Sequence, residues 1–313
     1  MTVEIVQVSG LPAFVTEALA ADFTIHNLIG HPDPAALTAE IGPRVRGMLA
    51  SAQRGPDAAM FDRFPKLEVV SSFGVGVDSI DVAAAKARGV VVANTPDVLT
   101  DCVADMAVCL MFDALRRVAE GDRFVRAGCW PAEGSMRFGR KIGGTRLGIV
   151  GFGRIGQGIA QRAAAFGMKI AYTGPRRKAD QPYPYFDSPA ALAAESDVLM
   201  LACPGGPATE KMIGKAVLDA LGPEGWLVNI SRGSVVDEAA LIAALRENRI
   251  AGAALDVFVN EPNIDPAFLT LENAVLCPHA GSATYETRKA MGQLTIDNLR
   301  SWFANGTAIT PLP

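Results

Sequence analysis

The sequence predicts an α/β protein made of two doubly wound parallel-sheet domains, and three observations lead to this prediction. Strand and helix patterns alternate over the first hundred residues and again after residue 145, which is typical of parallel sheets with helices on both faces. A G-x-G-x-x-G run lies between a strand pattern and a helix pattern, where a Rossmann-like unit requires it. The 313 residues suffice for two domains with separate cores. We expect an active site in the cleft between these domains.

The first domain is predicted from short apolar segments separated by turn residues. We expect strands at Val3–Val8, Val45–Leu49, Leu67–Ser71 and Val90–Ala93, and helices at Leu11–Ala20, Pro56–Phe64 and Ile80–Arg88. The Asn94-Thr95-Pro96 segment breaks the alternation, and one long helix is expected from Leu99 to about Arg126.

The stretch Thr145–Arg177 organises the second domain. An apolar run ends at Gly151, and Gly153 and Gly156 complete the glycine pattern. Such a loop between a strand and a helix lets backbone N–H groups approach a pyrophosphate at the helix N-terminus, which predicts dinucleotide binding. The second strand is expected at Lys169–Tyr172. The apolar face of the helix between them is expected to comprise Ile155, Ile159, Ala160, Ala163 and Ala164.

The turn after that second strand indicates which dinucleotide binds. An NAD site places an acidic residue there, to bind the ribose 2′-hydroxyl. Here Thr173 is followed by Arg176, Arg177 and Lys178, with no carboxylate before Asp180. Guanidinium groups match phosphate oxygens in a bidentate fork, so the turn favours the 2′-phosphate of NADP(H). A solvated basic turn is the alternative interpretation.

Three polar segments follow predicted strands later in the chain. Further strands are expected at Val198–Ala202, Trp226–Ile230, Ala253–Val257 and Ala274–Cys277, and helices at Ser188–Ala194, Lys215–Leu221, Glu238–Asn248 and about Thr284–Phe303. Arg232, Glu261 and His279 each lie beyond the carboxyl end of one of these strands, the edge at which open α/β sheets bind ligands. Arg can bind and polarise a 2-oxo acid, His can donate a proton, and Glu can hold the imidazole protonated and oriented.

Composition excludes several classes of protein. The formal net charge of −4 argues against nucleic acid as a main partner, and no long uncharged apolar run predicts a membrane span. The first ten residues lack the regions of a signal peptide, so we expect a cytoplasmic protein. Five scattered cysteines predict reduced, mostly buried thiols. With only three histidines, no metal site is expected.

These motifs together resemble the D-isomer-specific 2-hydroxyacid dehydrogenase family over essentially the whole chain. The resemblance rests on the segments Ser72–Asp78, Asn94–Thr100, Gly151–Gly156, Asn229–Gly233 and Pro278–Gly281, with Asp256 and Glu261-Pro262 between the last two. It implies that Arg232, Glu261 and His279 form the catalytic set. It also implies substrate contacts from Val75, Gly76, Arg232 and His279.

The resemblance further implies coenzyme contacts from the glycine loop, the basic turn and the strand ends. The implied residues are Gly151, Gly153, Arg154, Ile155, Gly156, Thr173, Arg176, Arg177, Cys203, Pro204, Thr209, Ile230, Ser231, Arg232, Asp256, His279, Gly281 and Thr100. By the same resemblance, residues 1–97 form a substrate-binding domain, completed by a C-terminal helix at about 283–313. Residues 98–282 form the NADP-binding domain, with a dimer-forming arm at about 101–140.

Within the family, the basic turn is similar to that of NADPH-preferring glyoxylate/hydroxypyruvate reductases, and the chain also resembles hydroxyphenylpyruvate reductases. This implies a homodimer that reduces a small 2-oxo acid with NADPH. Trp130 is expected either to reach the partner's substrate pocket or to pack at the interface. Two alternatives stay open: an NADPH-sensing protein like the corepressors that share this fold, and an NAD-dependent phosphoglycerate-type dehydrogenase.

Overall fold

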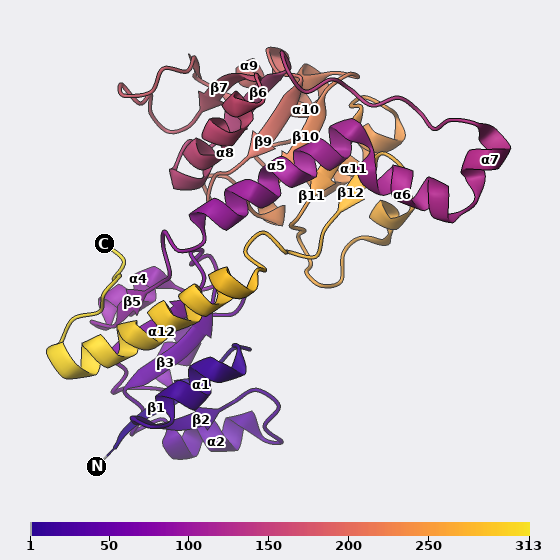
Figure 1. Ribbon diagram of the computed structural model, residues 1–313. Coiled ribbons are helices and arrows are strands. Elements are labelled where there is room, and N and C mark those ends of the chain that lie inside the picture. Colours follow the sequence, from indigo (N-terminus) through magenta and orange to yellow (C-terminus); the bar gives the residue numbers. More distant parts are fainter. Residues whose placement is uncertain (1) are drawn as a thin grey trace. The chain divides into compact units, whose positions relative to one another are not determined.

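A computed structural model describes residues 2–313, which form two compact units. The first comprises residues 2–99 and 284–313, and the second comprises residues 100–283. Each unit is built on one parallel sheet (Figure 1), so the predicted α/β class with two doubly wound sheets is confirmed. The expected position of an active site between the units stays a prediction.

The first unit contains a five-stranded sheet in the order β2-β1-β3-β4-β5. Its strands are β1 (Val3–Gln7), β2 (Phe23–Asn27), β3 (Gly47–Ser51), β4 (Val69–Phe73) and β5 (Val91–Ala93). Its helices are α1 (Ala13–Leu19), α2 (Pro34–Ile41), α3 (Ala58–Asp62), α4 (Val82–Ala87) and α12 (Tyr285–Asn305). The order 2-1-3-4-5 is one of the two common doubly wound arrangements.

The side chains of alternate strand residues pack into two hydrophobic cores, one on each face of this sheet. Ile5, Leu49 and Val69 pack with buried residues of α1 and α12, whereas the neighbouring residues of the same strands pack with α2, α3 and α4. This division follows from the two-residue period of a strand. The C-terminal helix α12 is fixed to β4, since Ser71 Oγ donates a hydrogen bond to Thr295 O over 2.9 Å.

The second unit contains a seven-stranded sheet in the order β12-β11-β10-β9-β6-β7-β8. The strands are β6 (Arg146–Val150), β7 (Lys169–Thr173), β8 (Tyr185–Phe186), β9 (Val198–Leu201), β10 (Trp226–Asn229), β11 (Gly252–Leu255) and β12 (Ala274–Leu276). Neighbouring strands of this sheet are parallel throughout, so their carboxyl ends meet at one edge. The strand order reverses between β6 and β9, which is where such sheets bind ligands.

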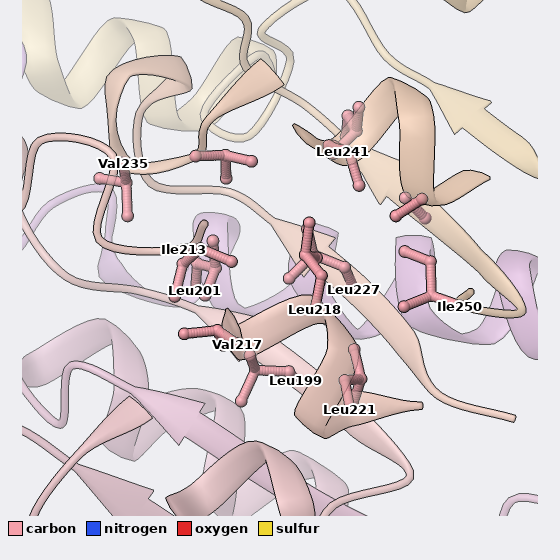
Figure 2. Packing of buried hydrophobic residues seen from close by; sticks show 14 of the residues in the cluster. Leu199, Leu201, Ile213, Val217, Leu218, Leu221, Leu227, Val235, Leu241 and Ile250 are labelled. Carbon is pink, nitrogen blue, oxygen red and sulfur yellow. The ribbon is translucent and has the colours of Figure 1, made fainter. Parts of the chain in front are cut away.

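Helices cover both faces of the second sheet. On one face α5 (Thr100–Arg116) packs against α8 (Arg154–Ala165) and over β10 and β11. On the other face α9 (Pro189–Ala194), α10 (Lys215–Leu221) and α11 (Glu238–Arg246) enclose a leucine-rich core (Figure 2). Helices α6 (Val118–Arg126) and α7 (Cys129–Glu133) form an arm, and short 3-10 helices lie at Gly233–Val235 and Pro266–Thr270.

The structure corrects the prediction of one long helix from Leu99 to Arg126. Arg117 adopts a left-handed conformation, with a φ of 55°, and separates α5 from α6. At this break the Asp113 carboxylate accepts a hydrogen bond from Ala119 N over 2.7 Å, and Arg117 pairs with Glu120 over 2.6 Å. These side chains satisfy polar groups at the helix ends, which continuous apolar periodicity does not reveal.

Within residues 2–313, and apart from the two 3-10 helices, four elements have no counterpart in the sequence prediction, namely β2, α2, α7 and β8. Strand β2 alternates apolar and polar residues but buries only Phe23, and β8 has only two residues. Strands β3 and β4 also begin two residues later than predicted. Val45 N bonds to Ile41 O and Leu67 N to Phe64 O, because the chain is still turning out of the preceding helices.

Two predictions about burial were wrong. Ala164 is exposed on α8, at the margin of the buried face formed by Gly156, Ile159, Ala160 and Ala163. Of the five cysteines only Cys203 is buried, and Cys109 is exposed. A methyl group or a thiol is small, so exposing it costs little. Within residues 2–313, no helix has the length and apolarity that crossing a bilayer requires.

Candidate active site

The three glycines of the coenzyme loop meet three different steric demands. Gly151 has a φ of 92°, and a Cβ there would lie 2.5 Å from the backbone of Cys203. A Cβ at Gly156 would lie 2.3 Å from Gly151 O, whereas a Cβ at Gly153 would meet nothing within 4 Å. The first and third glycines therefore permit a tight turn and close packing, and the second leaves the backbone open to a ligand.

The N-terminus of α8 is suited to bind phosphate groups. Gly153 is its N-cap, and no side chain caps the first turn. The leading N–H groups of a twelve-residue helix thus face the space beside Gly153, together with the positive end of the helix dipole. The residues present fit a dinucleotide pyrophosphate at this position.

The basic turn after β7 is fixed by two tyrosine hydroxyls. Lys178 N donates to the Tyr172 hydroxyl over 2.8 Å, and the Tyr185 hydroxyl donates to Gly174 O over 2.9 Å. Phe152, from the glycine loop, stacks on the Tyr172 ring with centroids 4.3 Å apart. The sequence prediction missed Tyr185, because its strand is too short to produce a pattern.

The arginines on this turn are available to a ligand. Arg176 and Arg177 are exposed, and within residues 2–313 neither forms a salt bridge. Thr173 is instead buried, with 3% of its surface exposed, and its carbonyl accepts a hydrogen bond from Gly151 N over 2.9 Å. The guanidinium groups are therefore better placed than the Thr173 hydroxyl to meet a 2′-phosphate.

Most of the other predicted coenzyme residues lie in the segments that follow β9 and β10, where hydrogen bonds and burial fix their positions. The Asn229 amide oxygen accepts bonds from Ser231 N over 3.0 Å and from Ser231 Oγ over 2.8 Å. Thr209 Oγ1 donates to Pro204 O over 2.8 Å. Burial raises the pKa of the Cys203 thiol to about 11, so this thiol stays protonated at neutral pH. Ile230 is buried, and Thr100 begins α5.

The structure brings Glu261 and His279 into direct contact. His279 Nδ1 lies 2.6 Å from Glu261 Oε2. An ionised carboxylate only accepts hydrogen bonds, so Nδ1 carries the proton. Within the described residues, Nε2 of the same ring makes no hydrogen bond. This leaves Nε2 as the ring nitrogen that can act on a bound molecule.

The Glu261 carboxylate is kept ionised by its neighbours. Burial raises the pKa of Glu261, but the hydrogen bond from His279, a second from Phe258 N over 2.9 Å, and the charges of His279 and Arg232 outweigh burial. The pKa of Glu261 consequently lies below its ordinary value. The ionised carboxylate is therefore the acceptor of the hydrogen bond from His279 Nδ1.

Asp256 shapes the backbone that carries His279. Its two carboxylate oxygens accept hydrogen bonds from Ala280 N over 2.6 Å and from Gly281 N over 2.8 Å. Asp256 O also accepts a bond from His279 N over 2.9 Å, and His279 has a φ of 51°. Burial raises the pKa of Asp256, and the two amides partly oppose that shift. This carboxylate therefore holds His279 in an unusual left-handed conformation.

Arg232 is placed by the end of β10 and by the glycine after it. Asn229 Nδ2 donates to Arg232 O over 3.0 Å, and Arg232 Nη1 donates to Ser231 O over 2.7 Å. A Cβ at Gly233 would lie 2.0 Å from the carbonyl carbon of Phe258. Only glycine lets this segment pack on the loop that carries Glu261, so the charge of Arg232 acts on Glu261.

In the first unit, the loop after β4 presents unpaired backbone amides. Asn94 Nδ2 donates to Val75 O over 2.8 Å, and Gly74 N donates to Thr95 Oγ1 over 3.1 Å. Within residues 2–313, the amides of Val75 and Gly76 have no hydrogen-bond partner. Two anchored but unpaired N–H groups are suited to bind a carboxylate.

The arm of the second unit exposes apolar surface. Trp130 is 61% exposed and Phe138 is 92% exposed. A groove of about 1080 Å³ runs between α5, the arm and residues 268–277. Val118, Val125 and Leu269 are also exposed. Large exposed apolar side chains of this kind are typical of surfaces that contact another protein.

Comparison with known proteins gives consistent matches. Residues 108–281 match the NAD-binding domain of D-isomer-specific 2-hydroxyacid dehydrogenases. A 2-ketogluconate reductase of Gluconobacter oxydans is 45% identical over 309 residues, which are 99% of this chain and 98% of that protein. A glyoxylate/hydroxypyruvate reductase of Arabidopsis thaliana is 42% identical over 96% of both chains.

A solved structure is similar over the whole chain. It is the NADPH-dependent glyoxylate/hydroxypyruvate reductase of Sinorhizobium meliloti in complex with NADP and malonate. The two proteins are 41% identical, with a TM-score of 0.94 over 100% of this chain and 97% of the other.

Proposed function

This chain belongs to the D-isomer-specific 2-hydroxyacid dehydrogenase family, and we propose that it reduces a small 2-oxo acid to the D-2-hydroxy acid with NADPH. The substrate is of the glyoxylate or hydroxypyruvate type. The observation that carries this proposal is the contact of 2.6 Å between His279 Nδ1 and Glu261 Oε2. This contact supports His279 as an oriented proton donor, and the charge of Arg232 acts on the same Glu261 carboxylate.

Each catalytic residue has a separate task in this reaction. NADPH, when bound, supplies the hydride for the carbonyl carbon. The Arg232 guanidinium binds the substrate carboxylate and polarises the carbonyl, with the amides of Val75 and Gly76 as further carboxylate ligands. His279 Nε2 donates the proton that the carbonyl oxygen requires. Glu261 keeps the imidazole protonated and oriented before the proton moves.

We assign residues 1–97 with about 283–313 to substrate binding, and residues 98–282 to coenzyme binding. NADP(H) is favoured over NAD(H) because Arg176 and Arg177 are exposed on a turn that carries no acidic side chain before Asp180. The 2′-phosphate of NADPH offers these guanidinium groups an anionic partner, which NADH lacks.

We also propose that the protein is a cytoplasmic homodimer. The arm at 101–140 and the groove beside it would be covered by the same surface of a second copy, as two-fold symmetry requires. Trp130, with 61% of its surface exposed, either packs in this interface or reaches the partner's substrate. A Trp130→Ala variant separates the two roles, because only the second changes KM for the 2-oxo acid in an intact dimer.

The proposed function is tested by turnover with the purified protein. NADPH oxidation should be followed with glyoxylate, hydroxypyruvate, 2-ketogluconate and hydroxyphenylpyruvate, and then with NADH under the same conditions. Chiral analysis of the product should show the D-hydroxy acid. Binding of NADPH without turnover of any of these acids would instead favour a coenzyme-sensing protein, and a clear preference for NADH would favour the phosphoglycerate-type alternative.

A further inference from the structure

We propose that Glu238 is a positioning residue that fixes the loop carrying Glu261 and so aligns the proton donor His279. Glu238 lies in the first turn of α11, outside the three residues assigned to catalysis. The inference rests on the proposed function, because it concerns how the same histidine is oriented.

A chain of hydrogen bonds links Glu238 to His279. Glu238 Oε1 accepts a bond from Val259 N over 2.7 Å. The preceding amide, Phe258 N, donates to Glu261 Oε1 over 2.9 Å, and Glu261 Oε2 contacts His279 Nδ1 over 2.6 Å. Two successive amides of one loop are thus bound by two carboxylates. A displacement of Val259 would carry Phe258 with it and alter the bond that orients Glu261.

Gly233 restricts this peptide from another direction. A Cβ at Gly233 would lie 2.0 Å from the Phe258 carbonyl carbon and 2.3 Å from Val259 N. The peptide between Phe258 and Val259 therefore packs on backbone that cannot yield. Steric contact with Gly233 and the bond to Glu238 together hold the loop in one position, with Arg232 adjacent to it in sequence.

The carboxylate of Glu238 is not needed to cap its own helix. Asp237 already does so, since its Oδ1 accepts a bond from Ala240 N over 3.2 Å. Burial, and then the charges of Asp265 and Glu261, raise the pKa of Glu238, while the bond from Val259 N opposes this shift. The helix dipole favours an acid in this first turn, but the cap is already supplied by Asp237, so the Glu238 carboxylate is left to accept the bond from Val259 N.

Substitution of Glu238 should change catalysis more than stability. Glu238→Ala removes the acceptor for Val259 N and should lower kcat by about tenfold or more, the size expected for one charge-assisted hydrogen bond. KM for NADPH should stay within about twofold of wild type, because α11 does not carry the coenzyme loop. Glu238→Gln keeps an oxygen acceptor and should restore most of kcat.

Asp237→Ala is the matched control, because it removes the cap of the same helix without touching Val259. It should lower the melting temperature and leave kcat nearly unchanged. A Glu238→Ala variant with wild-type kcat would overturn the inference. So would equal losses of kcat in the Asp237 and Glu238 variants, since they would show only helix destabilisation.

A spectroscopic readout keeps the test independent of turnover. The Nδ1 proton of His279 should give a far-downfield proton resonance, and the chain has only three histidines, so His279→Ala and His26→Gln suffice to assign it. Glu238→Ala should shift or broaden this resonance, and Asp237→Ala should not. If wild-type protein turns over no 2-oxo acid, the proposed reaction fails. An unmoved resonance in Glu238→Ala overturns the positioning role separately.

Discussion

Replacing Arg176 and Arg177 together by alanine should lower kcat/KM for NADPH by at least about tenfold. A hydrogen bond to a charged group contributes roughly 1.5–3 kcal/mol, so two full contacts would give at least about a hundredfold loss. Both side chains are exposed, and solvent screening reduces this figure, which leaves about 1.4 kcal/mol, or tenfold, as the lower bound. No salt bridge within residues 2–313 must break first, so the loss reports the contact with coenzyme.

The assay compares kcat/KM for NADPH and NADH at saturating 2-oxo acid and at two ionic strengths. The NADH value should hardly change, and the NADPH value of wild type should fall as salt rises. Arg63→Ala combined with Lys66→Ala removes the same charge from exposed positions in the first unit and serves as the control. Unchanged NADPH kinetics in the arginine variant, with a wild type that prefers NADH, would refute the assignment of this turn.

Three further substitutions test two members of the catalytic set, Arg232 and His279, and the Asp256 carboxylate that supports His279. Arg232→Ala should raise KM for the 2-oxo acid and lower kcat together, and Lys should rescue poorly because an ammonium cannot make the bidentate contact; steady-state kinetics with unaltered constants would remove Arg232 from the site. His279→Ala should reduce kcat by about 10²–10⁴-fold, the usual contribution of a general acid, and an active variant would contradict the mechanism. Asp256→Asn replaces one of the two oxygens that accept bonds from Ala280 N and Gly281 N by an amide group. The backbone at His279 should then be held less firmly, and kcat should fall by about tenfold. An unaltered rate would show that these two bonds are not needed for catalysis.

The sequence predicts those parts of the fold that depend on short-range periodicity. Helix α10 has the predicted bounds, and the strands that precede Gly151, Arg232 and His279 lie within a residue or two of their predicted positions. Strand β8 and the break at Arg117 were not predictable in this way. A two-residue edge strand has no period, and the break depends on side-chain hydrogen bonds from Asp113 and Arg117.

The candidate site likewise has a part that the sequence predicts and a part that depends on contacts between distant segments. The order of the motifs predicts that Arg232, Glu261 and His279 follow strands whose ends meet at one edge of a parallel sheet. It does not predict that Asp256 binds the amides of Ala280 and Gly281, or that Glu238 binds Val259 N. These contacts join segments that are distant in sequence. Nothing in the local sequence around Glu238, at the start of a helix, or around Asp256, at the end of a strand, indicates which backbone amides they bind.

The central claim, that a carboxylate-supported His279 donates the proton, is tested most directly by the pH profile of Glu261→Gln. The pKa of Glu261 lies below its ordinary value, so the carboxylate is ionised at neutral pH, and its negative charge lies 2.6 Å from Nδ1 of the imidazole that must be protonated for reduction. Reduction should therefore fall on the alkaline side, where the imidazolium loses its proton, and oxidation of the hydroxy acid should rise over the same range. Gln keeps a hydrogen-bonding group without the charge, so the alkaline limb of kcat for reduction should move to lower pH. An alkaline limb that stays at its wild-type position in Glu261→Gln would contradict the account.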